Sequence, residues 1–458
     1  MDVHRTEEIQ LDRGRNSDYD NVIYNFEEGE YSTFASETTP KEVLLLCSSG
    51  VLSSLLSTIV KLITFSIMKR FLAYSTQLKG SVSDFIITIC GMYMLYTSLS
   101  ISSTFPWFIL YVFTPTTVII LSRSWHFKSG FISSFTAVGG IIFLQCLLEP
   151  DIFASFRGVL MITAMKITSY AYDVDSGYRI KWLEYLSYIF DPSSVLFGPW
   201  FSISDFTIWK LTKTLKEEVT DLIYASFSLL IALIFVTYST CIIDSVFPQS
   251  GFWYYFGVAQ SFRTSHYFVC YLSQSMMLTS GLSVGSITQW SRIEFPQSLV
   301  DVVVSWNLPM HRFLRKYVFL KFRSSGIGIA IFATYAFSSL LHGVNFQLSA
   351  VLLSLGLYTY AETRIRKRLS VRLDACVSVK ECKEDCYHAY KKSSLLVTAL
   401  SLMFTLLSVG HLIYLGMVFD GSGETTGYSA IHTLSVWRRC YFISHFVAFC
   451  TLLMSFFI

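Results

Sequence analysis

Charged residues are scarce in this sequence. Of its 458 residues, 15% are charged and 52% are hydrophobic, and the mean hydropathy is +0.49. An average soluble domain carries roughly 25% charged residues. The shortage of charge therefore excludes an ordinary soluble domain and predicts an all-α, polytopic membrane protein.

Other absences narrow the class further. The chain has no basic start followed by an apolar core and a small-residue cleavage site, so we expect no cleavable signal peptide. No repeat of roughly 20–50 residues is visible, and the halves do not mirror each other as those of many transporters do. A Gly-x-Ser-x-Gly motif is missing, as is a convincing cysteine–histidine nucleophile pair, so a covalent acyl-enzyme is not predicted.

Long apolar runs are abundant instead. A membrane helix needs about 17–25 mostly apolar residues, and the candidate spans are 43–68, 81–102, 106–121, 130–149, 222–244, 253–282, 327–341, 344–361, 394–419 and 440–458. The stretches 152–172 and 185–206 are shorter or more polar, which predicts re-entrant or interfacial helices. The sequence thus predicts about ten or eleven membrane helices.

The first 41 residues differ in kind from the rest, because acidic side chains dominate them. This composition is typical of disorder, so we expect 1–41 to be a disordered tail and 42–458 to form one membrane domain. Basic residues cluster in several places, among them Arg312 to Arg323 and Arg364 to Arg372. The positive-inside bias favours the cytosolic side for these segments.

Two polar residues stand out within apolar sequence, Asn307 and His342. Moving an acyl group to a hydroxyl needs a base for the hydroxyl proton and a donor for the oxyanion on the acyl carbon, and His342 and Asn307 offer these groups. Tyr335 and Ser338 would share a helical face with His342 and give it polar neighbours. The alternatives are a packing role for His342 and a helix cap for Asn307.

A loop cluster is formed by Cys376, Cys382 and Cys386, with His388 directly behind it. These residue types could hold zinc, but their spacing matches no strong metal pattern. Local packing, a loop disulfide and acylation of a cysteine remain alternatives.

Arg157, Met161 and Met165 recur at four-residue steps and so lie on one helical face. A flexible methionine stripe would suit the wall of an acyl-chain site. Ordinary helix packing explains the same spacing.

Five short motifs carry a resemblance to a known family: Ala-Met-Lys at 164–166, Phe-Gly-Pro-Trp at 197–200, Glu-Phe-Pro-Gln-Ser at 294–298, Ser-Trp-Asn-Leu-Pro at 305–309 and Leu-Leu-His-Gly at 340–343. In this order, from about residue 80 onward, the chain resembles the membrane-bound O-acyltransferases, and among them the branch that acylates Wnt proteins. The resemblance implies a helix bundle around an intramembrane tunnel in the endoplasmic reticulum membrane.

The same resemblance implies an activity and its partners. A cis-monounsaturated palmitoleoyl group would pass from palmitoleoyl-CoA to a serine of a Wnt protein, which enables Wnt secretion and signalling. His342 would be the catalytic histidine and Asn307 its partner, while Trp306, Tyr335, Ser338 and Leu341 match positions near the acyl tunnel. Besides these substrates and membrane lipid, no cofactor, no metal at the site and no nucleic acid are expected.

One departure from the family concerns His266, which stands where an asparagine is expected before Tyr-Phe. For this reason His266 is left out of the predicted catalytic residues.

Basic residues offer a second, less specific prediction. Arg315, Lys316, Lys321 and Arg323 could meet the CoA phosphates, or could serve topology alone.

Other functions remain open at this point. The acceptor could be a lysophospholipid or a sterol, or the chain could be a non-catalytic transporter or receptor in which Asn307 and His342 join helices by hydrogen bonds.

Overall fold

The structure is a computed structural model of the chain. It describes residues 40–458 apart from 75–79, 99–103, 180, 209–212, 249, 284, 381, 383–385 and 421–428. Nearly all of the acidic tail predicted at 1–41 lies outside the described residues, so its predicted disorder stays a prediction.

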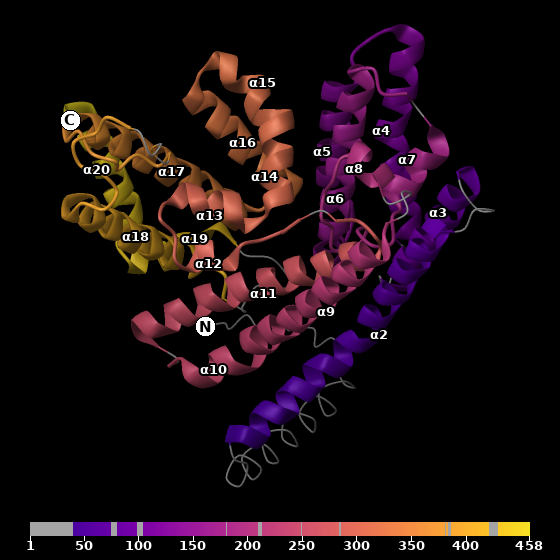
Figure 1. The fold of residues 1–458 in the computed structure, drawn as a ribbon, viewed down its shortest axis with the longest axis horizontal. Coiled ribbons are helices and arrows are strands. Elements are labelled where there is room, and N and C mark those ends of the chain that lie inside the picture. The colour runs from indigo at the N-terminus through magenta and orange to yellow at the C-terminus, as the bar shows by residue number, and fades with distance from the viewer. Residues whose placement is uncertain are drawn as a thin grey trace, which may run out of the picture. The chain divides into compact units, whose positions relative to one another are not determined.

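The described residues form helices and no β-strand (Figure 1). A single isolated β-bridge joins Ala375 and Tyr390. The elements in chain order are α2 (Pro40–Tyr74), α3 (Ser81–Ser98), α4 (Phe105–Trp125), α5 (Ser129–Leu147), α6 (Pro150–Asp175), α7 (Trp182–Ile189), α8 (Ile203–Thr207), α9 (Leu215–Thr237), η2 (Tyr238–Ile242), α10 (Ile243–Val246), α11 (Gly251–Thr279), α12 (Trp290–Glu294), α13 (Leu299–Trp306), α14 (Leu308–Leu314), η3 (Arg315–Phe319), α15 (Leu320–Phe322), η4 (Arg323–Ser325), α16 (Ile327–Leu341), α17 (Phe346–Arg372), α18 (Leu395–Gly416), α19 (Ala430–Arg439) and α20 (Ile443–Phe457). The all-α prediction is confirmed.

The chain divides into two units, Met1–Leu52 and Ser53–Ile458. Of the first unit, the structure describes the start of α2, from Pro40. The second unit holds the remainder of α2 and every other helix.

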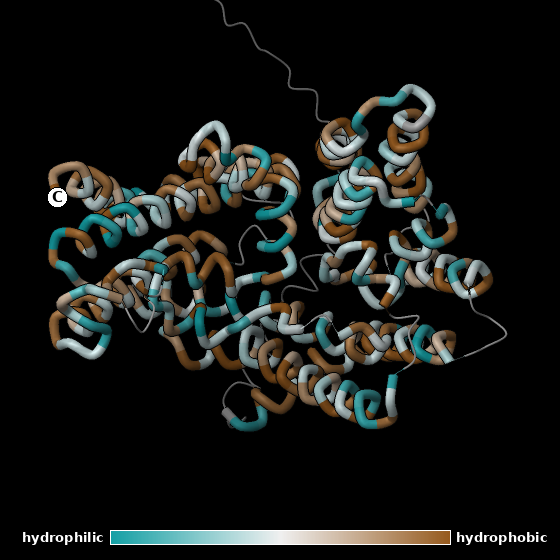
Figure 2. Tube along the Cα trace, turned by 45° about the horizontal axis from the view of Figure 1, so that its top comes forward, coloured by the Kyte–Doolittle hydropathy of each residue, from teal (hydrophilic) through white to brown (hydrophobic). Residues whose placement is uncertain are grey.

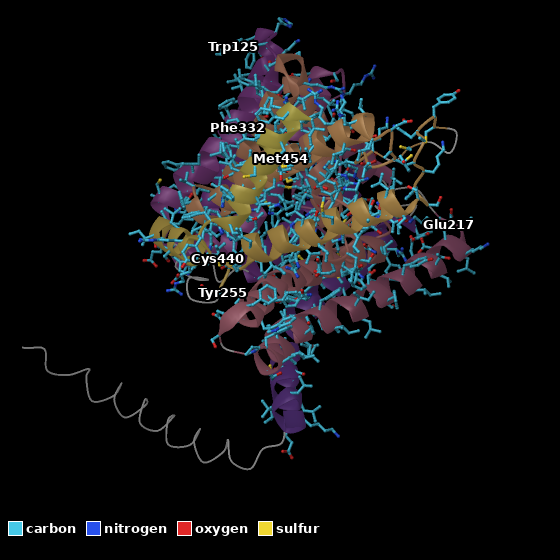
Figure 3. The ribbon with its side chains drawn as sticks, turned by 90° about the vertical axis from the view of Figure 1, so that its left-hand side faces the viewer. Trp125, Glu217, Tyr255, Phe332, Cys440 and Met454 are labelled. Carbon is cyan, nitrogen blue, oxygen red and sulfur yellow. The ribbon has the colours of Figure 1, made fainter. Side chains whose placement is uncertain are left out.

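Within the described residues, six helices are long and apolar enough to cross a membrane, or seven if α19 and α20, bent by 75°, form one broken span. The six are α2, α4, α5, α6, α9 and α18. The prediction of a polytopic membrane protein is therefore confirmed. Figure 2 shows apolar residues along most of the long helices, and large apolar side chains such as Trp125, Phe332 and Met454 are exposed on helix surfaces (Figure 3), as lipid contact requires.

Some segments differ from the sequence-based expectation. The stretch 152–172, predicted as re-entrant or interfacial, lies in α6, whose 26 residues suffice to cross a bilayer. The helix in the structure is longer than the predicted stretch at both ends, because it begins at Pro150 and continues to Asp175. The stretch 185–206 forms only the short helices α7 and α8, in keeping with a segment that does not span.

Four other predicted spans become helices that fail the criteria for a spanning helix. They are α3, α11, α16 and α17, of which α16 has 15 residues and α17 ends in a basic segment. Apolar runs in the sequence therefore did not separate these helices from full spans, because α16 is apolar but short and α17 joins an apolar run to a basic one.

A buried charge cluster ties α2 to α6 in the second unit. Lys69 Nζ lies 2.7 Å from Asp191 Oδ1, and both side chains are fully buried. Lys166 Nζ donates to the Tyr188 carbonyl at 2.7 Å and to Ser194 Oγ at 2.9 Å. The lysine of the Ala-Met-Lys motif therefore stabilises the fold, because its buried ammonium group has the hydrogen-bond partners that burial requires.

Candidate active site

A cavity of about 1340 Å³ opens among α6, α11, α13, α14, α16 and α17. Its volume exceeds the roughly 300–1,000 Å³ of a typical small-molecule pocket. The surface of the walls is mainly apolar, and the polar residues that line it include Asn307 and His342. Such a cavity suits a substrate with a long apolar part and one reacting polar centre.

His342 stands at the point where α16 ends. Its backbone N–H donates to the Ser339 carbonyl at 3.0 Å, and Gly343 follows with φ +82°. Gln145 of α5 holds this turn, because its Oε1 accepts from Val344 N at 2.6 Å and its Nε2 donates to the Val344 carbonyl at 2.9 Å. The Leu-Leu-His-Gly motif therefore fixes a turn that presents His342 to the cavity.

The glycine of this motif has a steric reason. A Cβ at Gly343 would lie 2.6 Å from Gln145 Oε1, and the positive φ already disfavours other residues. Only glycine allows the amide of Gln145 to approach the turn behind His342.

Asn307 occupies the single residue between α13 and α14. Its Oδ1 accepts from Met310 N at 3.0 Å, so its side chain caps α14, and Pro309 lies in the first turn of that helix. The capping role considered from the sequence is therefore real. It is also compatible with catalysis, because a cap that occupies Oδ1 orients the amide NH₂ and leaves its two donors for other partners.

Trp306, which directly precedes Asn307, contacts His266 of α11. The indole stacks on His266 with ring centroids 4.3 Å apart and an interplanar angle of 9°. His266 Nε2 lies 2.9 Å from the Trp306 carbonyl oxygen, which can only accept, so Nε2 carries the proton and donates. His266 thus holds the backbone immediately before Asn307.

Only some of the other predicted substrate-binding residues line the cavity. Trp306, Tyr335 and Ser338 line the cavity together with Asn307 and His342. Leu341 does not line it among the described residues; its side chain is fully buried in the protein.

The methionine stripe is likewise divided, since Arg157 and Met161 line the cavity whereas Met165 is buried elsewhere. Of the two methionines, only Met161 can therefore contact an acyl chain in the cavity.

Of the four basic residues predicted to meet phosphate, Arg315 lines the cavity. Lys316 Nζ instead lies 3.2 Å from Asp173 Oδ1, and Lys321 Nζ lies 5.1 Å from the centre of the Tyr172 ring. The geometry therefore leaves Arg315 as the best placed of the four for an anionic group.

The motif that begins at Glu294 positions a further cavity residue. Arg263 Nε and Nη2 donate to the two carboxylate oxygens of Glu294 at 2.9 and 3.0 Å, and Tyr267 donates to the same carboxylate at 2.7 Å. A bidentate pair fixes the guanidinium in one orientation. Arg263 also lines the cavity.

Sequence reasoning left out His266 and Gln145. The imidazole in an apolar helix was a visible signal, since ionisable groups at membrane depth are costly and often functional. Gln145 gave no such signal, because its partners are backbone atoms 199 residues away in the sequence.

Comparison with known proteins shows the family of the chain. Residues 88–370 match the MBOAT, membrane-bound O-acyltransferase family, which is more than half of the chain, and the chain belongs to this family. It is also similar to proteins named "Protein-serine O-palmitoleoyltransferase porcupine". The protein of this name from Anopheles gambiae is 35% identical over 335 residues, covering 65% of this chain and 68% of the relative. Those from Mus musculus and Homo sapiens are each 31% identical over 370 residues, covering 72% of this chain and 80% of the relative.

Proposed function

We propose that this membrane-bound O-acyltransferase is a protein-serine O-palmitoleoyltransferase. It transfers a palmitoleoyl group from palmitoleoyl-CoA to a serine hydroxyl of a Wnt protein, in the endoplasmic reticulum membrane. The observation that carries the proposal is that Asn307 and His342, 35 residues apart in the sequence, line one large and mainly apolar cavity. The names of the relatives support the acyl group and the acceptor residue.

The reaction can be written with the groups of this cavity. The serine Oγ attacks the thioester carbonyl carbon while His342 accepts the hydroxyl proton. The carbonyl becomes an oxyanion, which the Asn307 NH₂ stabilises by a hydrogen bond. The C–S bond then breaks, and the sulfur of CoA leaves with the proton that His342 returns. Palmitoleoyl-CoA is a co-substrate in this scheme, and the scheme needs no cofactor and no metal at the cavity.

The remaining groups position the substrates. Apolar walls that include Met161 and Trp306 suit the acyl chain, and Arg315 offers a charge for a CoA phosphate. Tyr335 and Ser338 lie on the α16 face that leads to His342. These roles, like that predicted for Leu341, are expectations for mutagenesis.

The test is acyl transfer by purified full-length protein in detergent, using palmitoleoyl-CoA and a disulfide-linked Wnt hairpin peptide that contains the acceptor serine. We expect acylated peptide from the wild type, none from the same peptide with the serine replaced by alanine, and none from His342→Ala. His126→Asn is a matched control, because His126 is exposed, lies outside the cavity and has a positive φ that asparagine tolerates.

Folded wild-type protein that binds palmitoleoyl-CoA and transfers nothing to the peptide would overturn the proposed acceptor. Full activity of His342→Ala would overturn the proposed base.

A further inference from the structure

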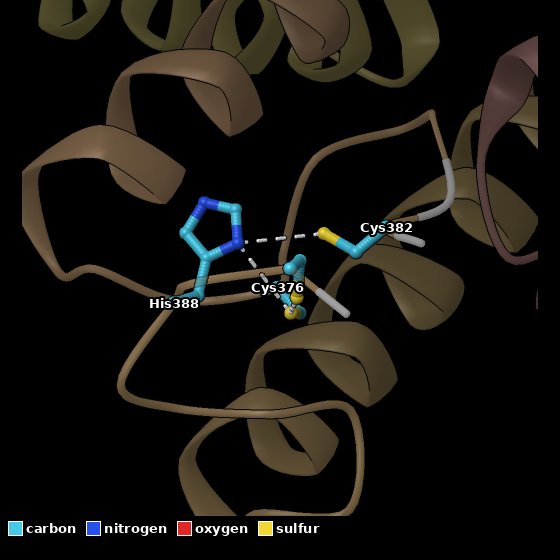
Figure 4. A group of neighbouring side chains, drawn as sticks. Cys376, Cys382 and His388 are labelled. Carbon is cyan, nitrogen blue, oxygen red and sulfur yellow. Dashed lines mark hydrogen bonds between the residues drawn. The ribbon is translucent and has the colours of Figure 1, made fainter. Parts of the chain in front are cut away.

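The connection between α17 and α18 gathers the three loop cysteines and a histidine at one point. Figure 4 shows three of these residues, Cys376, Cys382 and His388. The Sγ atoms of Cys376, Cys382 and Cys386 and a ring nitrogen of His388 all lie within 4.8 Å of one another. The four side chains are partly buried rather than freely exposed. They are far along the chain from Asn307 and His342, and none of them lines the cavity.

The distances within this cluster match those between ligands of one zinc ion. His388 Nδ1 lies 3.6 Å from Cys376 Sγ and 3.6 Å from Cys382 Sγ, while the Sγ atoms of Cys376 and Cys386 are 3.3 Å apart. In a tetrahedral site with zinc–sulfur bonds of about 2.3 Å and zinc–nitrogen bonds of about 2.05 Å, neighbouring sulfur and nitrogen ligands are about 3.6 Å apart and two sulfurs about 3.8 Å. Of these three pairs, only the Cys376 and Cys386 sulfurs would have to move apart, by about 0.5 Å.

A hydrogen-bond chain on the far side of the imidazole sets its tautomer. Ser370 Oγ donates to the Ala375 carbonyl at 2.7 Å, which uses its only proton. The contact of 3.4 Å between Ser370 Oγ and His388 Nε2 is then a hydrogen bond that His388 donates. With the proton on Nε2, the lone pair of Nδ1 points toward the sulfurs, as it does in metal-binding histidines held by an outer partner.

The backbone of the loop brings distant ligands together. Cys376 N donates to the Tyr390 carbonyl at 2.9 Å, and Tyr390 N donates to the Asp374 carbonyl at 3.0 Å. Asp374 Oδ2 also accepts from Ala389 N at 3.0 Å. These bonds clamp the two ends of the loop, so that Cys376 faces the side chain of His388.

Charge and connectivity favour a metal over the alternatives raised by the sequence. Three thiolates around Zn²⁺ leave one negative charge, and Lys391 Nζ lies 3.6 Å from Cys386 Sγ, where it would offset that charge. A disulfide would use only two of the four clustered side chains, whereas a metal ion would use all three sulfurs and the imidazole nitrogen. The basic end of α17 also favours the cytosolic side for this loop, where disulfides are rare.

We propose that Cys376, Cys382, Cys386 and His388 bind one structural zinc ion. Four protein ligands close the coordination shell, which is the arrangement of a structural rather than a catalytic site. Binding displaces one proton from each of the three thiols and leaves the imidazole neutral.

The consequence for the fold follows from Arg366 of α17. Arg366 Nε donates to the Val377 carbonyl at 2.8 Å, next to the first ligand, and Nη1 donates to the Gln297 carbonyl at 2.7 Å. Glu362, paired with Arg366 at 2.9 Å, accepts from Leu299 N at 2.8 Å. Through Arg366 and Glu362, the loop that holds the proposed zinc ligands is thus linked by hydrogen bonds to the start of α13. Asn307 directly follows the other end of α13.

The experiment measures metal by mass spectrometry in purified full-length protein, prepared in a thiol-free reductant, loaded with Zn²⁺ and freed of excess metal. We expect about one zinc per chain, as four protein ligands define one site. Cys382→Ser and Cys386→Ser should each lose nine-tenths or more of this zinc. Cys450→Ser, which removes a partly exposed cysteine of α20, is the matched control and should keep it.

A second measurement uses the wild type alone, in case the cysteine variants fail to fold. Replacement of zinc by Co²⁺ should give sulfur-to-cobalt charge-transfer and tetrahedral d–d absorption bands. Titration with a mercurial reagent should release the zinc as three thiols react.

Several outcomes would overturn the proposal. They are wild-type protein that holds less than a tenth of an equivalent of zinc after loading, zinc that persists in Cys382→Ser and Cys386→Ser, a disulfide among the three cysteines in peptide maps, and an acyl modification on one of them. Since none of these readouts depends on acyl transfer, failure here is distinguishable from failure of the proposed reaction.

Discussion

His266 lies parallel to Trp306 and donates to its backbone carbonyl, with ring centroids 4.3 Å apart and a donor–acceptor distance of 2.9 Å. The imidazole therefore fixes Trp306, the residue before Asn307, through ring stacking and through a hydrogen bond from its Nε2 proton. Nothing in this geometry requires a base at position 266. It makes His266 a positioning residue of the site.

This relationship predicts the effect of two substitutions. His266→Ala removes a hydrogen bond and an aromatic contact, together worth about 1–3 kcal/mol. We expect turnover to fall about tenfold or more while KM for palmitoleoyl-CoA changes less, because the variant displaces Asn307 rather than the acyl site. His266→Asn keeps a donor for the Trp306 carbonyl and should restore most of the activity. Equal activity of His266→Ala and wild type in steady-state acylation assays would contradict this role.

Substitutions of Asn307 can separate its two tasks. Asn307→Asp and Asn307→Ser keep an N-cap acceptor for Met310 N but lose the amide donor, whereas Asn307→Ala loses both. All three variants should lose about 10²- to 10³-fold in turnover, as removal of an oxyanion donor does. Only Asn307→Ala should also lose about 1 kcal/mol of stability. Turnover and thermal unfolding measured on the same preparations check both expectations, and an active Asn307→Ser would leave capping as the only role.

Gly343→Ala tests the turn behind His342. The new Cβ would meet Gln145 Oε1 at 2.6 Å in a backbone conformation with φ +82°, so we expect a loss of at least about 1 kcal/mol of stability and a strong loss of turnover. Gly139→Ala is the matched control on the same helix as Gln145, because a Cβ there meets nothing within 4 Å. Melting temperatures and acylation rates of both variants decide the question; similar values for the two would refute the steric argument.

The ion pair between Arg263 and Glu294 predicts a stability effect. Side-chain exposures of 6% and 16% show that both groups are largely buried. Loss of one partner leaves the other charge unpaired, so Glu294→Leu should cost about 3–5 kcal/mol. Lys181→Met, which removes an ion pair whose lysine is 67% exposed, should cost about 1 kcal/mol or less. Comparable unfolding temperatures for the two variants would show that burial of the Arg263 pair is unimportant.

The sequence predicted the helical class and the membrane location, and it singled out two polar residues, Asn307 and His342, that both line the cavity. These features are local, since they depend on apolar runs and on residues such as His342 that are conspicuous where they stand. The span count was less predictable, because α11 and α17 combine apolar sequence with polar faces that only the packing explains. Gln145 was not predictable at all, since an amide that bonds to backbone atoms leaves no pattern in the sequence.

That amide has a consequence for variation along the chain. Because Gln145 forms its hydrogen bonds with the backbone N–H and carbonyl of Val344, any residue except proline at position 344 can keep these bonds. The Val344 side chain is itself exposed. Position 344 is thus a permissive site two residues from His342, where a spectroscopic label or crosslinker could be attached to observe substrate entry without disturbing the turn.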